Sequence, residues 1–468
     1  MSDEVAFAGL VRQAEMVRAG EVTPSELVEL YLDRIERLDS ELNSYRVVLA
    51  DRARADAKAV EERLAGGGAD AMPLAGVPIA IKDTEDLEGE VTFWGTKAFD
   101  QPAAADGEMV RRLREAGAIV LGKTNLPELA ICGFTESEGW GITRNPWDTS
   151  RTPGGSSGGS GAATAAGLCA MASASDGGGS IRIPAAFNGL FGLKPQRDRI
   201  PLAPYKEHWH GLSVVGSVSR SVADTALWLD VTAGGVAGGP PEPEVTFLEA
   251  AHAQPASLRI AYSTKPVRAV LPPTVTDEVK GAVAEAADLL RSLGHQVEAR
   301  DPKWGQVGNN MTPRYLNGVT VEVDRVPHPE RLEKRTRGFG RIGRPLGGRV
   351  LRGARRGEAK DARRILSIFD DCDVLVMPVT GEPPLDAGRW EGKSALRTLL
   401  GMSRAYPFCI PWNHLGNPAA SVPMGFTPQG WPLAVQLVGR PNDETTLLSL
   451  AAQIESERPW ADRLPPVS

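Results

Sequence analysis

Two glycine-dense segments that carry serine stand close together in this sequence, at residues 154–160 and 176–184. A serine hydroxyl attacks a carbonyl carbon when a base removes its proton. Consecutive glycines before a serine allow several backbone N–H groups to point at one spot, as a negatively charged tetrahedral oxygen requires. The second segment therefore suggests a nucleophile, Ser180. We expect an oxyanion hole formed by the backbone N–H groups of Gly177, Gly178, Gly179 and Ser180.

Glycine and serine are also typical of flexible linkers, so the surroundings of the two segments decide which interpretation holds. An Ala-rich stretch at residues 162–174, which we expect to be helical, separates them, and an apolar stretch at residues 187–193 follows. A linker would not be bounded by such packed segments. The glycines are therefore predicted to belong to the folded core.

Lys82 is the candidate base for the serine. The chain has six histidines, and none of them stands in a recognisable catalytic context. Lys82 ends an apolar segment, residues 76–81, that is typical of a short buried strand. Because a free lysine has a pKa of about 10.4, burial would have to lower the pKa of Lys82 to roughly 7–8 for it to act as a base.

Two other motifs match known patterns but stand in the wrong context. Residues 117–124 read GAIVLGKT and fit the P-loop pattern, yet the residues between the glycines are apolar and predict a strand instead of a phosphate-binding loop. Residues 155–159 contain the GxSxG pattern of α/β hydrolases, but a turn-rich segment precedes them where that motif needs a strand. Nucleotide binding and a Ser-His-Asp triad are both disfavoured.

The elements that must position these side chains alternate between helix and strand. Residues 23–26 fit a capping box with proline at the first helical position, and helical periodicity continues to residue 35. Helices are predicted at residues 109–116 and 279–293, and strands at residues 118–121, 258–262, 295–299 and 374–379. This alternation predicts an α/β fold.

Composition excludes several classes of protein. Hydrophobic residues make up 42% and charged residues 24% of the 468 residues, as in ordinary globular domains. With a net charge of −7, no overall field attracts nucleic acid or anionic lipid, and the Arg-rich residues 325–364 are interspersed with acids, so we expect a solvated helical surface there. No membrane span or secretory signal is predicted, and a cytoplasmic location is the expectation.

Cysteine and histidine spacing indicates neither a metal site nor a cofactor. The four cysteines are scattered without CxxC spacing, and we expect them to be reduced core residues: Cys132, Cys169, Cys372 and Cys409. Metal binding at His208 and His210 is disfavoured, because the neighbouring sequence adds no third histidine to the pair.

The chain resembles the amidase signature family, whose hallmark is a Ser/Gly-rich block carrying a Ser–Ser–Lys catalytic triad. Residues 76–83 (GVPIAIKD) resemble the lysine strand of that family, residues 154–160 its first serine block and residues 178–185 its nucleophile block. Ser156 and Ser180 stand 24 positions apart (180 − 156), the spacing of the family. Further similar segments extend the resemblance over nearly the whole chain: residues 121–125, 143–147, 192–195, 416–421 and 436–439.

The resemblance implies a single amidase-signature domain of the α/β class, in which a large mixed β-sheet is surrounded by α-helices. Within it, residues 1–65 would form N-terminal helices and residues 66–235 the catalytic core with the Ser/Gly-rich signature. Residues 300–365 would form a variable helical cover, and residues 370–468 the C-terminal part of the core.

The resemblance also implies an activity, the hydrolysis of a carboxylic amide without metal or cofactor. Neutral Lys82 would draw a proton through Ser156, and Ser180 would attack the carbonyl to form an acyl-enzyme that water then hydrolyses. The choice of Ser156 over Ser157 rests on the family spacing.

The residues around the triad are expected to support the site. Ser157, Asp176 and Arg182 would organise it, although Arg182 could also meet an anionic substrate. Many relatives have another residue at the position of Gly177. This extra glycine would either loosen the oxyanion hole or make room for a bulkier acyl group.

The substrate stays open among small-molecule amides, anilides, linear or cyclic amide oligomers, carbamates and esters. Residues 138–147 resemble the branch that contains 6-aminohexanoate cyclic dimer hydrolase. An alternative is the glutaminase subunit of a tRNA-dependent amidotransferase, which works with partner chains; the apolar residues 183–187 favour a free amidase. A non-catalytic binding protein on the same fold would not require the three triad residues. Whether the chain forms a homo-oligomer is left open.

Overall fold

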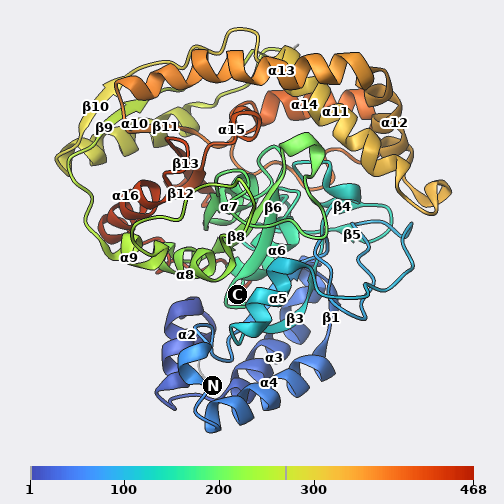
Figure 1. Cartoon of the computed structure of the whole chain (residues 1–468), viewed down its shortest axis with the longest axis vertical. Coiled ribbons are helices and arrows are strands. Elements are labelled where there is room, and N and C mark those ends of the chain that lie inside the picture. Colours follow the sequence, from blue (N-terminus) through green and yellow to red (C-terminus); the bar gives the residue numbers. More distant parts are fainter. Residues whose placement is uncertain (1–2, 269–270) are drawn as a thin grey trace.

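A mixed sheet of eleven strands runs through the middle of the molecule (Figure 1). The computed structural model describes residues 3–268 and 271–468. The sheet strands are β1 (Tyr45–Val48), β2 (Pro78–Lys82), β3 (Ile119–Thr124), β6 (Ala172–Asp176), β7 (Phe191–Lys194), β8 (Val214–Ser219), β9 (Arg259–Tyr262), β10 (Gln296–Ala299), β11 (Val374–Pro378), β12 (Ala419–Phe426) and β13 (Pro432–Gly439). A separate two-stranded sheet holds β4 (Glu136–Ser137) and β5 (Gly141–Ile142).

The sheet is mixed because it contains both parallel and antiparallel strand pairs. The strand order is β1-β3-β2-β6-β8-β7-β12-β13-β11-β9-β10. β2 lies parallel to β3 and β6, and β9 lies parallel to β10 and β11, whereas the other neighbouring pairs are antiparallel. The predicted α/β class, with one large mixed sheet flanked by helices in a single domain, is confirmed.

Helices flank the sheet (Figure 1). The α-helices are α1 (Asp3–Ala6), α2 (Gly9–Arg18), α3 (Pro24–Leu42), α4 (Ala50–Ala65), α5 (Glu108–Glu115), α6 (Gly158–Ala165), α7 (Arg182–Asn188), α8 (Val222–Thr232), α9 (Phe247–His252), α10 (Asp277–Ser292), α11 (Gly308–Asp324), α12 (Lys334–Gly343), α13 (Gly348–Ile365), α14 (Ala395–Ala405), α15 (Ile410–Leu415) and α16 (Glu444–Glu457). Short 3-10 helices are η1 (Ala69–Ala71), η2 (Glu128–Ala130), η3 (Trp209–Gly211), η4 (Pro329–Arg331), η5 (Arg344–Leu346) and η6 (Leu366–Asp370).

Local sequence signals explain where several of these elements begin. The predicted capping box at the start of α3 is present, because the Thr23 side chain accepts from the Glu26 N–H while the Glu26 carboxylate accepts from the Thr23 N–H. Gly117, with a φ of +97°, separates α5 from β3, as predicted. β3 also contains residues 119–124 of the P-loop-like motif, so these residues form a strand and not a phosphate-binding loop.

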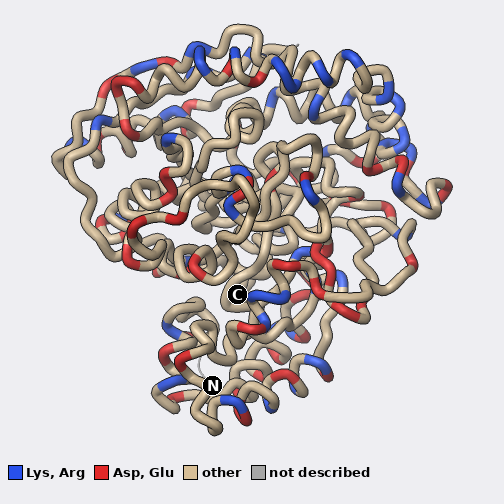
Figure 2. Tube along the Cα trace, viewed as in Figure 1, with Lys and Arg blue, Asp and Glu red and all other residues tan. Residues whose placement is uncertain are grey.

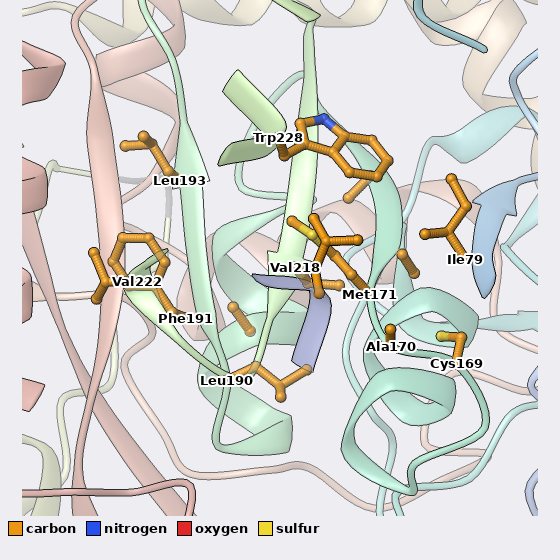
Figure 3. Packing of buried hydrophobic residues seen from close by; sticks show 14 of the residues in the cluster. Ile79, Cys169, Ala170, Met171, Leu190, Phe191, Leu193, Val218, Val222 and Trp228 are labelled. Carbon is orange, nitrogen blue, oxygen red and sulfur yellow. The ribbon is translucent and has the colours of Figure 1, made fainter. Parts of the chain in front are cut away.

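The apolar core packs against the central strands. Figure 3 shows Ile79 of β2, Phe191 of β7, Val218 of β8 and Trp228 of α8 among the residues of this cluster, and all four are at most 1% exposed. Burial of each large apolar side chain contributes roughly 1.5–3 kcal/mol relative to exposure. All four cysteines are likewise buried and free. The core thus fixes the strands whose ends carry the polar residues described below.

The prediction of a helix over residues 162–174 is wrong in its second half. α6 ends at Ala165, Gly167 adopts a φ of +64°, and the chain then forms β6 between β2 and β8. Alanine and serine have little preference that distinguishes helix from a central strand, and contacts with neighbouring strands decide the outcome. The difference matters because β6 carries polar residues of the candidate site.

The region of residues 300–365 is largely helical and lies at the end of the molecule opposite the N-terminal helices (Figure 1). It contains α11, α12 and α13. Figure 2 shows Lys and Arg along α12 and α13, and Arg349, Arg352 and Arg356 are exposed, in keeping with the expected solvated helical surface. Among the described residues, no helix combines the length and apolar character needed to cross a membrane.

Candidate active site

Lys82 is the last residue of β2, where the neighbouring strand β6 supplies it with hydroxyl partners. Its Nζ atom lies 2.7 Å from Ser156 Oγ and 2.8 Å from Ser175 Oγ, and its backbone N–H donates to Ser173 Oγ at 2.8 Å. The side chain is fully buried, and this burial lowers the pKa of Lys82 from 10.5 to about 7. The amine can therefore be neutral near neutral pH, as a base must be.

The two adjacent serines of the first block have different partners. Ser156, joined to Gly155 by a cis peptide bond, places its hydroxyl on Lys82. Ser157 instead donates its N–H to the Ser180 carbonyl at 3.3 Å, and its Oγ lies 3.3 Å from both the N and the O of Ser175. Ser156 thus contacts the lysine, whereas Ser157 ties its loop to β6 and to the nucleophile segment.

Ser180 follows β6 after the three glycines and is partly exposed. Gly179 has a φ of +126°, and a Cβ there would lie 2.8 Å from both Cys409 Cβ and Ile183 Cδ1. Only glycine fits that conformation and that space. The sharp turn at Gly179 is what presents Ser180 at the junction of two pockets.

A buried ion pair anchors the turn before Ser180. Arg182 donates through Nε and Nη2 to the two carboxylate oxygens of Asp176 at 3.0 and 2.9 Å, and both side chains are fully buried. Arg182 also donates to Asn413 Oδ1, to Gln436 Oε1 and to the Cys409 carbonyl. Burial alone would raise the pKa of Asp176, but the charge and hydrogen bonds of Arg182 hold this pKa well below its usual range. Arg182 therefore faces protein groups and not a substrate anion.

The Asp176 carboxylate also accepts from the Gly179 N–H at 2.6 Å and from the Ile181 N–H at 3.2 Å. This contact changes one expectation, because the Gly179 N–H points at Asp176 and is not free for an oxyanion. Three of the four expected donors are left for that role: the backbone N–H groups of Gly177, Gly178 and Ser180.

Gly177 makes room for an aromatic ring of the protein. A Cβ at Gly177 would lie 2.8 Å from Cε3 of Trp209, and one at Gly318 of α11 would lie 3.1 Å from the Trp209 Cα. Trp209 is thus seated between two glycines, and its ring also meets Tyr315 edge-on at 5.3 Å. The space that the sequence suggested for a bulkier acyl group is filled by Trp209.

Two pockets meet at Ser180. The larger has a volume of about 640 Å³ and lies between residues 130–133, α11, α14 and α15. The smaller is lined by Ser156, Ser175 and residues 84–86. Ala130, Ser180 and Trp209 line both. A substrate that spans the two pockets would therefore cross the Ser180 hydroxyl.

Sequence reasoning missed Ser175, Trp209 and Glu85 as residues of this site. The alternation Ala172-Ser-Ala-Ser-Asp176 is a period-2 pattern that could have indicated a strand with serines on one face. Trp209 reaches the site through a φ of +49° in η3, and Glu85 through a turn in which its N–H donates to the Lys82 carbonyl at 3.0 Å. Neither feature has a signal in the local sequence.

Comparisons with known proteins agree with this arrangement. The family model described as Amidase matches residues 26–448. The chain belongs to the amidase family. This amidase is 52% identical over 466 residues to the protein named "Putative amidase AmiB2" of Mycobacterium tuberculosis, with 99% of each chain covered. It is 34% identical over 468 residues to an acylamidase of Rhodococcus erythropolis, with 97% of this chain and 96% of that one covered.

The fold of this amidase is similar to a solved structure of 6-aminohexanoate cyclic dimer hydrolase. The TM-score is 0.90, the sequence identity is 30%, and 99% of each chain is covered. The resemblance to the amidase signature family, and to the cyclic dimer hydrolase within it, is thereby confirmed. This protein is an amide-hydrolysing enzyme.

Proposed function

We propose that this amidase hydrolyses a carboxylic amide through an acyl-enzyme on Ser180, with Ser156 as proton relay and Lys82 as base. The observation that supports it best is the 2.7 Å contact between Lys82 Nζ and Ser156 Oγ at a lysine whose pKa is lowered to about 7. A lysine with an ordinary pKa would be protonated at neutral pH and could not accept a proton.

In the acylation step neutral Lys82 accepts the proton of Ser156, and Ser156 accepts the proton of Ser180. The Ser180 oxygen attacks the amide carbon, and the N–H groups of Gly177, Gly178 and Ser180 stabilise the negative charge on the carbonyl oxygen. Donors that are already in place supply about 2.7–4 kcal/mol each to such a transition state.

The leaving nitrogen then takes a proton from Ser156, which recovers it from Lys82, and the C–N bond breaks. Water attacks the acyl-enzyme by the reverse route, and the carboxylic acid leaves. Of the groups on this proton path, Lys82 and Ser156 are in contact at 2.7 Å. Each proton that Lys82 accepts is returned within the same half-reaction, so the cycle regenerates neutral Lys82.

A substrate panel tests the proposal. The purified single chain is incubated with short and long alkyl amides, an anilide, the cyclic dimer of 6-aminohexanoate, a carbamate, an ester and glutamine, and product release is followed. Ser180→Ala and Lys82→Ala are expected to lose hydrolysis, whereas Ser150→Ala, an exposed serine outside the site, is the matched control and is expected to keep it.

Each alternative gives a different result in this panel. Full activity in Ser180→Ala would mean that another residue is the nucleophile. Hydrolysis of glutamine alone, and only after addition of cell extract, would favour the glutaminase subunit of an amidotransferase. Faster hydrolysis of the carbamate or the ester than of every amide would mean that the enzyme is a carbamate or ester hydrolase that uses the same triad.

A further inference from the structure

The two pockets that meet at Ser180 differ in chemical character. The larger is lined mainly by apolar side chains, including Ile131, Met311, Leu399, Met402 and Ile410, and Arg268 is the one charged residue in its described lining. Its volume of about 640 Å³ lies within the range of roughly 300–1,000 Å³ typical of small-molecule sites. The smaller pocket carries two acidic residues, Glu85 and Asp86, beside the relay hydroxyl.

The proposed mechanism decides which half of the substrate each pocket receives. The leaving nitrogen must take its proton from Ser156, and among the described residues Ser156 lines only the smaller pocket. The amine part of the amide therefore occupies the smaller pocket. The acyl part, which stays attached to Ser180, extends into the larger one.

Among the described residues, no cation forms an ion pair with the Glu85 carboxylate. Its carboxylate accepts from the Thr84 hydroxyl at 3.1 Å. Two lysines act on its charge: Lys82, which is neutral in the proposed mechanism, and Lys123, whose Nζ is paired with Asp83 at 2.9 Å. The neighbouring carboxylate of Asp86 adds a second negative charge, and its Oδ1 accepts from Thr92 at 2.7 Å.

The other basic groups at this pocket are also engaged. His208 lines the pocket, and its Nε2 lies 2.9 Å from Glu322 Oε1 on α11. Arg325 donates to the hydroxyl of Tyr205 at 2.7 Å and forms an ion pair with Glu322. Burial raises the pKa of Glu85 to about 7, so a bound cation would favour its ionised form.

We propose that Glu85 determines specificity by binding the leaving amine, so that the preferred substrates join a long uncharged acyl group to a compact amine that carries a second, positively charged nitrogen. This inference rests on the proposed function and names the substrate class of the same site. A partly buried carboxylate that meets an ammonium group forms a charge-assisted hydrogen bond, which a neutral amine of the same shape cannot replace.

Three decanoyl amides of nearly equal size test the proposal. They are N-(2-aminoethyl)decanamide, N-propyldecanamide and N-decanoylglycine, whose amine parts are cationic, neutral and anionic at about pH 8. We expect the wild-type kcat/KM to be about tenfold higher for the cationic than for the neutral amide, which corresponds to about 1.4 kcal/mol, and lowest for the anionic one.

The ratio between the cationic and neutral amides is the decisive readout, because any effect of Glu85 on Lys82 changes both rates alike. Glu85→Gln is expected to bring this ratio close to one. Glu85→Asp, which retains the charge, is expected to keep a preference for the cationic amide. Glu88→Gln, an exposed carboxylate on the same segment, is the matched control and should leave the ratio as in the wild type.

The outcomes separate this inference from the proposed function. An unchanged ratio in Glu85→Gln, or equal wild-type rates on all three amides, would overturn the role of Glu85 while leaving amide hydrolysis in place. If Glu85→Gln does not fold, the wild-type order of the three amides and the ratio in Glu85→Asp still decide. No hydrolysis of any amide in the wider panel would overturn the proposed function, and this inference with it.

Discussion

The indole ring of Trp209 packs on the α-carbon of Gly177, where any Cβ would lie 2.8 Å from a ring atom. The contact joins the segment that carries the proposed oxyanion donors directly to η3. It also explains why a third glycine stands before the nucleophile.

Gly177→Ala is therefore expected to destabilise the protein. A methyl group must displace the ring or the backbone, at a cost of about 1–3 kcal/mol in the free energy of unfolding. At Gly178 the nearest atom to a new Cβ lies 3.8 Å away, so Gly178→Ala is the matched control and should be tolerated. Urea unfolding of the two variants measures the difference, and equal midpoints would show that Trp209 does not constrain Gly177.

The pH dependence of activity should follow the deprotonation of Lys82. Burial lowers the pKa of Lys82 to about 7, and the base is active in its neutral form, so kcat/KM should rise about tenfold per pH unit below that value and level off above it. The negative charge of Glu85 raises the pKa of Lys82, so Glu85→Gln should move the midpoint to lower pH. A profile that is flat between about pH 5 and 9 would argue against a lysine base.

The two serines whose hydroxyls contact Lys82 Nζ should contribute unequally to the rate. Ser156→Ala removes the proposed relay and should lower kcat by about 10²–10⁴-fold. Ser175→Ala removes a hydroxyl at 2.8 Å from Lys82 Nζ that takes no part in the proposed proton path, so we expect a loss of less than about tenfold. Single-turnover kinetics on one amide rank the two variants. A larger loss in Ser175→Ala would reassign the relay.

The main effect expected from removing Arg182 is a loss of stability of the folded protein. Arg182→Met leaves the fully buried carboxylate of Asp176 without its cation, and breaking a buried pair in this way costs about 3–5 kcal/mol. The double variant Asp176→Asn/Arg182→Met should recover part of that loss, because no uncompensated charge is left. Thermal unfolding of the single and double variants checks this order, and an unaltered melting temperature in Arg182→Met would contradict it.

Lys82 itself should reduce stability at low pH. Between about pH 7 and 10.5 the unfolded chain holds the Lys82 proton and the folded chain does not, so the contribution of this group to the free energy of unfolding rises with pH in that window. Lys82→Met should therefore gain stability relative to the wild type below pH 7, and this gain should shrink at higher pH. Denaturant titrations at about pH 6 and pH 9 measure it; a gain independent of pH would contradict the lowered pKa.

The spacing of apolar residues, together with capping residues and glycine, was enough to predict the strand that ends in Lys82, the capping box of α3 and the glycine that separates α5 from β3. These signals failed over residues 166–174, because alanine and serine carry little information about the neighbours that make β6 a central strand. The resemblance to a family proposed Lys82, Ser156 and Ser180 together, and the fold brings the first two into contact. Glu85 and Trp209 were missed, because a tight turn after β2 places Glu85 and packing between Gly177 and Gly318 places Trp209.

The bonds of Arg182 have a consequence for the order in which the enzyme becomes active. They join the turn before Ser180 to Asn413 on α15 and Gln436 on β13, more than two hundred positions further along the chain. A ribosome that has made the entire Ser/Gly-rich block has therefore made the nucleophile, but not the late partners that complete the contacts of Arg182. We expect the nascent chain to gain full hydrolytic activity only when β13 pairs with β12, so that activity appears together with the last strand of the sheet.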